Sequence, residues 1–242
     1  MTPQFPPLLT SHELKVGQSP ARKAAAGALK GKYGAGDVLW LRDNDTLDYA
    51  VVLEPEVDRT KALDMIFVQM VALGDAIGAI GPPELAITHH WPNKILANGA
   101  EIGSVRAILS EEDDVDGYPR FMVISTHINV RPTADNIDPG LDQSRTTLWD
   151  EGCGDLDAMM VLDSTARHFM SWVHTWDEEG FQPVLTQLDG RMVQGHALSI
   201  TDIDGTFLGL DESANLLLKH DGGTQLVAVT DGLDTTIMAH VE

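Results

Sequence analysis

An Asn-Gly pair at positions 98 and 99 constrains the fold of this chain more than any other local feature. A type I′ turn needs positive φ at both central residues, and Asn followed by Gly meets this need best. Because such a turn fixes the register of its flanking strands, the sequence predicts a tight hairpin. We expect four opposed pairs: Ala97 with Ala100, Leu96 with Glu101, Ile95 with Ile102, and Lys94 with Gly103.

Side chains on the predicted hairpin alternate between its two faces. One face collects small and apolar residues and is a candidate core surface: Ile95, Ala97, Ala100 and Ile102. On the other face Lys94 and Glu101 are diagonal neighbours, roughly 7–8 Å apart at Cα. This spacing is within reach of two long side chains, so the sequence predicts an ion pair between them.

The rest of the first 189 residues alternates between strand and helix patterns. Ser19 and Pro20 provide an N-cap and a first-turn proline, which predicts a helix through Leu29. Apolar residues recur at helical spacing over 60–79 and 155–178. Strand patterns cover 37–42, 49–53, 85–88, 100–109 and 121–130. A short acidic connection, 43–48, joins the first two strands, and an acidic loop covers 110–120.

The pattern changes near residue 190. Four short strand patterns follow, separated by Asp-Gly turn signals: 197–203, 205–210, 216–220 and 225–229. Closely spaced hairpins over about 50 residues are typical of a small β-barrel. We therefore expect two domains, 1–189 and 190–242.

Composition narrows the function classes. A net charge of −21 and a pI near 4.5 argue against nucleic-acid and anionic-membrane partners, because both need clustered Lys and Arg. No apolar run approaches the roughly 20 residues that span a bilayer, which favours a cytoplasmic protein. The single cysteine excludes an internal disulfide, and the nine histidines show no zinc-ligand spacing, so we expect no bound metal or cofactor.

Four motifs resemble those of biotin and lipoate protein ligases, in the same order and at similar spacing. They are Trp91-Pro92-Asn93, Ile128-Asn129-Val130, Thr146-Thr147-Leu148 and the segment from Gly205 to Asp211. The resemblance covers most of the chain. It implies an α+β fold: a central sheet with flanking helices, similar to class II aminoacyl-tRNA synthetases, followed by a small SH3-like β-barrel.

The resemblance also implies an activity. Such ligases activate a small carboxylic acid with ATP and Mg²⁺ and pass it to a lysine of a carrier domain. The acid here would be biotin or a lipoate-like acid. Carried over residue by residue, the ligand contacts would be Trp91, Asn93, Gly103, Ser125 and Asn129.

Several positions depart from the family pattern where its chemistry takes place. His90 replaces a Lys, Lys94 replaces an Asp that helps hold nucleotide and metal, and Glu101 replaces a Lys that touches the biotin carboxyl. Ser125 and His127 replace two glycines. The acidic connection 43–48 stands where ligases carry a loop rich in Gly and Arg that covers the acyl-adenylate. Two interpretations fit: a blocked pocket, or a pocket shaped for another ligand.

The candidate catalytic residues are therefore His90, His127, Lys94 and Glu101. The two histidines would meet in the cleft as a pH-tunable pair, although lone histidines are more often structural. Cys153 is a candidate nucleophile because octanoyltransferases share this fold, but the neighbouring Glu151 and Asp155 would raise the thiol pKa. Three hypotheses follow: an ATP-dependent ligase, a catalytically degenerate protein that binds a ligand or a carrier domain, and a Cys153 acyltransferase.

Overall fold

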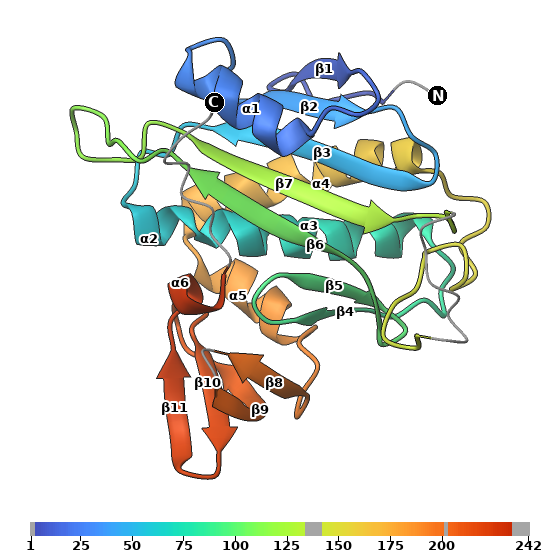
Figure 1. Cartoon of the computed structure of the whole chain (residues 1–242), viewed down its shortest axis with the longest axis vertical. Coiled ribbons are helices and arrows are strands. Elements are labelled where there is room, and N and C mark those ends of the chain that lie inside the picture. Colours follow the sequence, from blue (N-terminus) through green and yellow to red (C-terminus); the bar gives the residue numbers. More distant parts are fainter. Residues whose placement is uncertain (1–2, 134–141, 201–202, 234–242) are drawn as a thin grey trace.

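The chain folds into two β-sheets with helices around the larger one. The computed structural model describes residues 3–133, 142–200 and 203–233. A seven-stranded sheet has the order β1-β2-β3-β7-β6-β5-β4, and a four-stranded sheet has the order β11-β10-β9-β8. The smaller sheet lies at one end of the molecule (Figure 1). The fold is thus a mixed α+β fold, as predicted.

The large sheet is antiparallel except for one pair. Its strands are β1 (Thr10–Leu14), β2 (Asp37–Leu41), β3 (Thr46–Leu53), β4 (Ile87–His90), β5 (Lys94–Ala97), β6 (Ala100–Leu109) and β7 (Met122–Asn129). The parallel pair joins β1 to β2. The sequence pattern did not distinguish β1 from the extended lead-in around it, because this edge strand is mostly exposed and lacks an apolar alternation.

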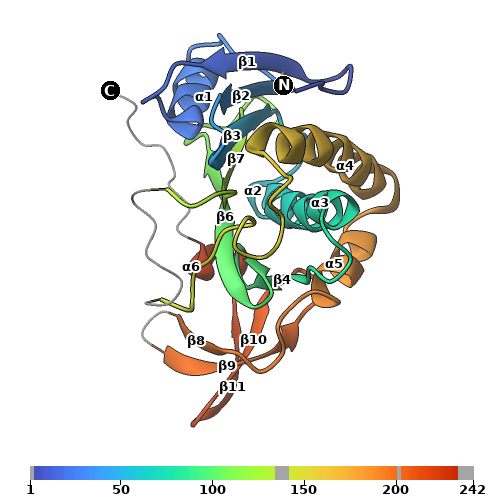
Figure 2. The same cartoon turned by 90° about the vertical axis from the view of Figure 1, so that its right-hand side faces the viewer.

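Helices cover both faces of the large sheet (Figure 2). They are α1 (Pro20–Leu29), α2 (Arg59–Ala62), α3 (Asp64–Ile80), α4 (Ala158–Glu179) and α5 (Gln182–Asp189). The helix predicted over 60–79 is divided at Leu63, where α2 ends and α3 begins. The bounds of α1 agree with the sequence expectation, and the Ser19 hydroxyl caps it by accepting from the Arg22 amide at 3.4 Å.

The two faces of the large sheet carry cores of different size. Helices α3 and α4 pack together over one face and form the main core with residues such as Val105, Ile124 and Ile128. On the other face, Ala24 and Ala25 of α1 pack in a second, smaller core. Helix α1 packs mainly against β2, β3 and β7. It therefore leaves the β6 side of this face uncovered.

Helices α2 and α3 correct the expectation that no apolar run approaches the length needed to span a bilayer. Residues Arg59–Ile80 are long and apolar enough to cross a bilayer by length and composition alone. However, 78% of the most apolar part of this run is buried inside the protein. That burial is typical of a core helix.

The Asn-Gly hairpin forms as predicted, with one change of register. Asn98 and Gly99 both have positive φ, 48° and 92°. Leu96 pairs with Glu101, but a bulge then shifts the ladder, so that Ile95 opposes Gly103 and not Ile102. The expected pairing of Lys94 with Gly103 is wrong for the same reason, since Lys94 opposes Ser104.

The connection between β2 and β3 is shorter than the sequence indicated. Strand β3 begins at Thr46, so only residues 42–45 join the strands, and Asp48 lies inside β3. The Asp43 carboxylate accepts from the Asp45 amide at 2.8 Å, which closes the turn. The carbonyl of Asp45 accepts from the amides of Val130 and Arg131, both at 2.8 Å, and ties the turn to the end of β7.

The four-stranded sheet is antiparallel and contacts the large sheet through Trp91. Its elements are β8 (Ala197–Ile200), β9 (Ile203–Leu210), β10 (Leu216–His220) and β11 (Gly223–Val227), followed by α6 (Val229–Gly232). The Trp91 indole N–H donates to the carbonyl of Ala214 at 2.9 Å. A second small sheet is thus present, consistent with a small C-terminal barrel.

Candidate functional site

A cavity of about 690 Å³ opens on the face of the large sheet that α1 covers only in part. Its floor is formed by β6 and β7, and the first turn of α1 forms one wall. In Figure 2, α1 lies on one side of the sheet and α3 and α4 lie on the other. The cavity is therefore separated from the main core by the sheet itself.

Strand alternation explains which side chains line the floor. On β7, Ser125, His127 and Asn129 line the cavity and alternate with the buried residues Thr126 and Ile128. Ile128 belongs to the main core, whereas Thr126 also contributes to the cavity wall. On β6, Ser104 and Arg106 occupy the same face. The ladder places these residues in rows: Asp48, His127 and Ser104 are opposed across three strands, and Arg106 opposes Ser125.

Gly103 is required by close packing between β6 and β7. A Cβ atom at this position would lie 1.9 Å from the carbonyl oxygen of His127. Gly103 also contributes to the cavity wall. Its lack of a side chain thus lets the two floor strands pair at the position where the hairpin enters the site.

The predicted ion pair lies at the hairpin end of the cavity. Lys94 Nζ is 2.7 Å from Glu101 Oε2, and the side chains are 50% and 22% exposed, respectively. Glu101 lines the cavity. Its amide donates to the carbonyl of Ser144 at 2.8 Å, and its carbonyl accepts from the Thr146 amide at 3.0 Å. These backbone bonds bring Arg145 to the same end of the cavity.

Three arginines from three separate segments line this cavity: Arg22, Arg106 and Arg145. Two carboxylates accompany them, Glu101 and Asp48. Burial raises the pKa of Asp48, and the nearby His127 opposes that rise. The three arginines and Asp48 were not among the site residues predicted from the sequence. The signal for Arg106 was its position two residues after Ser104, on the polar face of a strand whose other face is apolar.

His90 lies away from His127. In the strand register His90 opposes Lys94, Lys94 opposes Ser104, and Ser104 opposes His127. The two histidines are therefore three strand spacings apart, at about 4.8 Å each. His90 stacks on His196, with ring centroids 4.0 Å apart and an interplanar angle of 1°. Burial, and then the neighbouring His196 and Lys94, lower the pKa of His90 to about 4. The expected meeting of His90 with His127 in the cleft is therefore wrong.

Trp91 and Asn93 hold the hairpin in place and do not line the cavity. The Trp91 side chain is 1% exposed. A Cβ added at Gly232 would lie 2.1 Å from its ring, which shows how closely α6 approaches it. The Asn93 side-chain amide donates to the carbonyl of Val105 at 2.8 Å. Of the five expected ligand contacts, the structure brings Gly103, Ser125 and Asn129 together at the cavity.

Cys153 is buried outside the cavity. It is 3% exposed. Burial raises the pKa of its thiol, and the charge of Glu151 adds to that rise. A thiolate nucleophile needs the opposite environment. This geometry gives no support to the acyltransferase hypothesis.

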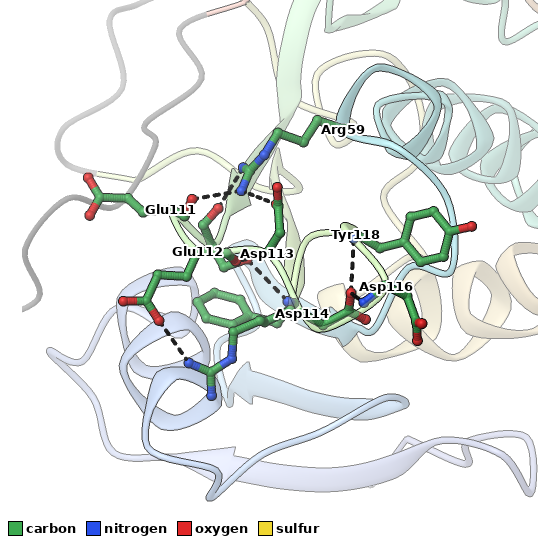
Figure 3. A network of polar contacts seen from close by, with 10 residues as sticks. Arg59, Glu111, Glu112, Asp113, Asp114, Asp116 and Tyr118 are labelled. Atoms are coloured by element: carbon green, nitrogen blue, oxygen red, sulfur yellow. Dashed lines mark hydrogen bonds and ion pairs between the residues drawn. The ribbon is translucent and has the colours of Figure 1, made fainter.

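The acidic loop between β6 and β7 is held by Arg59 of α2 and by contacts within the loop (Figure 3). The Arg59 guanidinium donates to the carbonyls of Ser110 and Glu111, at 2.6 and 2.7 Å, and pairs with Asp113 at 2.5 Å. The Asp114 carboxylate accepts from the amides of Asp116 and Tyr118, both at 2.9 Å. These contacts account for the fold of the loop. Within the described residues, no group of three or more His, Cys, Asp or Glu side chains is arranged to hold a metal ion.

Comparison with known proteins identifies the family. The model of the Biotin/lipoate A/B protein ligase family matches residues 5–189, more than half of the chain. The chain belongs to this family. The match spans the large sheet, its helices and every segment that lines the cavity.

Individual relatives agree with this assignment. The chain is 26% identical over 199 residues to a biotin–[acetyl-CoA-carboxylase] ligase of Paracoccus denitrificans, covering 79% of this chain and 81% of that protein. A biotin protein ligase-like protein of unknown function from Silicibacter sp. TM1040 superposes with a TM-score of 0.85 at 34% identity, covering 96% and 99% of the two chains. Biotin protein ligase from Aquifex aeolicus in complex with biotin and ATP shares the fold, with a TM-score of 0.70 at 18% identity over 90% and 95% of the chains.

Proposed function

We propose that this family member activates a small carboxylic acid with ATP and transfers the acyl group to a lysine of a carrier domain. The observation that carries the proposal is the open cavity beside the hairpin, lined by Asn129 and three arginines. A blocked pocket would instead require His127, Ser125 and the Lys94–Glu101 pair to fill this space. Biotin and lipoate-like acids are the first acids to test, because relatives of this fold are named as biotin ligases.

The residues of the cavity fit the charges of the proposed reactants. Arg145 lies at the hairpin end, where its guanidinium is available to a carboxylate or a phosphate. Asp48 supplies a carboxylate oxygen, the ligand type that Mg²⁺ prefers. Because the described residues contain no preformed metal cluster, Mg²⁺ would arrive with the nucleotide and keep phosphate and water ligands.

A second candidate function is binding without chemistry. Glu101 favours it, because this position of the family motif carries a lysine and here presents a carboxylate to the cavity. The Lys94 ammonium that balances this charge is held at 2.7 Å in the ion pair. In this case the protein would bind the acid or a carrier domain and would not form an adenylate.

The two functions separate in an exchange experiment. Purified protein is incubated with ATP, Mg²⁺ and radioactive pyrophosphate, together with biotin, lipoate, octanoate or a straight-chain dicarboxylate. A ligase gives acid-dependent incorporation of label into ATP. The variant Arg145→Gln should lower that rate at least about tenfold, since it removes a charged hydrogen bond, and the exposed-loop control Arg120→Gln should not.

Saturable binding of an acid by calorimetry, with no exchange, would refute the ligase proposal and support the second candidate. Absence of both binding and exchange across the series would refute both. Transfer to a lysine is then tested with an isolated carrier domain from the same organism, by the mass increase of the domain.

A further inference from the structure

The arginines of this chain divide into two groups. Nine arginines are present in a chain with 37 acidic residues. Five of them form ion pairs with carboxylates: Arg42, Arg59, Arg120, Arg167 and Arg191. Arg131 donates to the carbonyl of Leu156 and lies over the Trp149 ring. The three that remain are those that line the cavity, and within the described part of the chain their side chains form no ion pair with a carboxylate.

The three arginines lie at opposite ends of the cavity. The backbone of Arg145 pairs with that of Glu101 at the start of β6 in an isolated β-bridge. Arg106 is five residues further along the same strand, which corresponds to roughly 16 Å at about 3.3 Å per residue. Arg22 belongs to the first turn of α1, which packs in the smaller core with Ile108, two residues beyond Arg106. Arg22 and Arg106 thus form one positive end of the cavity, and Arg145 forms the other.

The carboxylates of the cavity leave both ends positive. Glu101 is held by Lys94, so its charge is balanced within the hairpin. Asp48 opposes His127 in the strand register, in the row between the two ends. A guanidinium matches the geometry of a carboxylate and binds it through two parallel hydrogen bonds. Asp142 lies near enough to Arg145 to interact with its charge, but within the described residues no carboxylate makes an ion-pair contact with Arg22, Arg106 or Arg145. A ligand would supply that contact at each end of the cavity.

We infer that the acid bound in this cavity carries a second carboxylate at its far end, so that one carboxylate meets Arg145 and the other meets Arg22 and Arg106. This inference rests on the proposed binding of an acid in the cavity, but it does not depend on ATP chemistry. It distinguishes the ligand from biotin and octanoate, each of which has a single carboxylate. A straight-chain dicarboxylate is the simplest molecule with the required charges.

The test compares mono- and dicarboxylates of equal chain length by isothermal titration calorimetry on the full chain. The probes are octanoate against suberate, and hexanoate against adipate. Suberate should bind at least about tenfold more tightly than octanoate, because hydrogen bonds to charged groups contribute about 1.5–3 kcal/mol. Arg106→Gln and Arg22→Gln should remove most of this preference. Arg145→Gln should weaken both ligands, and Arg120→Gln, outside the cavity, should change neither.

The possible failures are distinguishable. Equal affinity for octanoate and suberate, or a preference that survives in the Arg22→Gln/Arg106→Gln double variant, would overturn this inference. It would leave the ligase proposal standing if octanoate also supports exchange. Tight suberate binding without pyrophosphate exchange would support the inference and refute the ligase reaction. No binding by any of the acids would overturn both. Circular dichroism of each variant excludes loss of fold as the cause.

Discussion

His89 makes the stability of this protein sensitive to acid. The side chain is fully buried, and neither ring nitrogen has a hydrogen-bond partner within the described residues. Burial lowers the pKa of His89 from 6.5 to about 3, and the positive charge of Arg191 adds to the shift. Folding therefore requires the neutral imidazole, whereas the unfolded chain accepts a proton below about pH 6.5.

The sign and size of the effect follow from this difference. Because the folded pKa is the lower one, the stabilisation is complete above pH 6.5 and is lost as the pH falls toward 3. Each pH unit in this window costs about 1.4 kcal/mol. Between pH 7 and pH 4.5 the His89 contribution to the free energy of unfolding should fall by roughly 2.7 kcal/mol.

The measurement is urea denaturation of the wild type and of His89→Leu at several pH values. The variant should lose less stability on acidification, by roughly 2.7 kcal/mol at pH 4.5, and should stay within about 1.5 kcal/mol of the wild type at pH 7. His174→Leu, which replaces an exposed histidine with the same residue, is the matched control. If His89→Leu and the wild type lose stability in parallel, then His89 is not the buried neutral group described here.

Three further predictions concern the cavity and its neighbours. Gly103→Ala places a Cβ 1.9 Å from the His127 carbonyl and should destabilise the fold by at least about 1–3 kcal/mol, measured by thermal unfolding; an unchanged melting temperature would contradict the packing. A double-mutant cycle with Lys94→Met and Glu101→Gln should give a coupling energy below about 1 kcal/mol, since the pair is partly exposed, and a larger coupling would assign the pair a buried, structural role. Cys153→Ala should leave acid-dependent activity unchanged, and a loss of that activity in the variant would restore the acyltransferase hypothesis.

Local signals predicted the hairpin and α1 well. Asn98-Gly99 requires a turn that few other sequences adopt, and Ser19-Pro20 defines a helix start without help from distant residues. The bulge between Ile95 and Leu96 was not visible in the sequence, because the second hairpin strand, β6, also pairs with β7, which lies further along the chain.

The candidate site was predicted in part. Ser125 and Asn129 were predicted because they occupy positions of the strand motif that resembles biotin and lipoate protein ligases. His90 was assigned to the cleft because it adjoins the Trp91 motif, but Trp91 packs against the small sheet and His90 follows it to His196. The grouping of the three cavity arginines could not be predicted, because Arg22, Arg106 and Arg145 belong to segments that only tertiary packing brings together.

The central claim is that the cavity between β6, β7 and the first turn of α1 is an acid-binding site. A crystal structure of the protein with the acid that binds most tightly by calorimetry tests it most directly. We expect density for the acid over Ser125 and Asn129, with a carboxylate beside Arg145. Density for the acid at any other place on the protein, with this cavity empty, would contradict it.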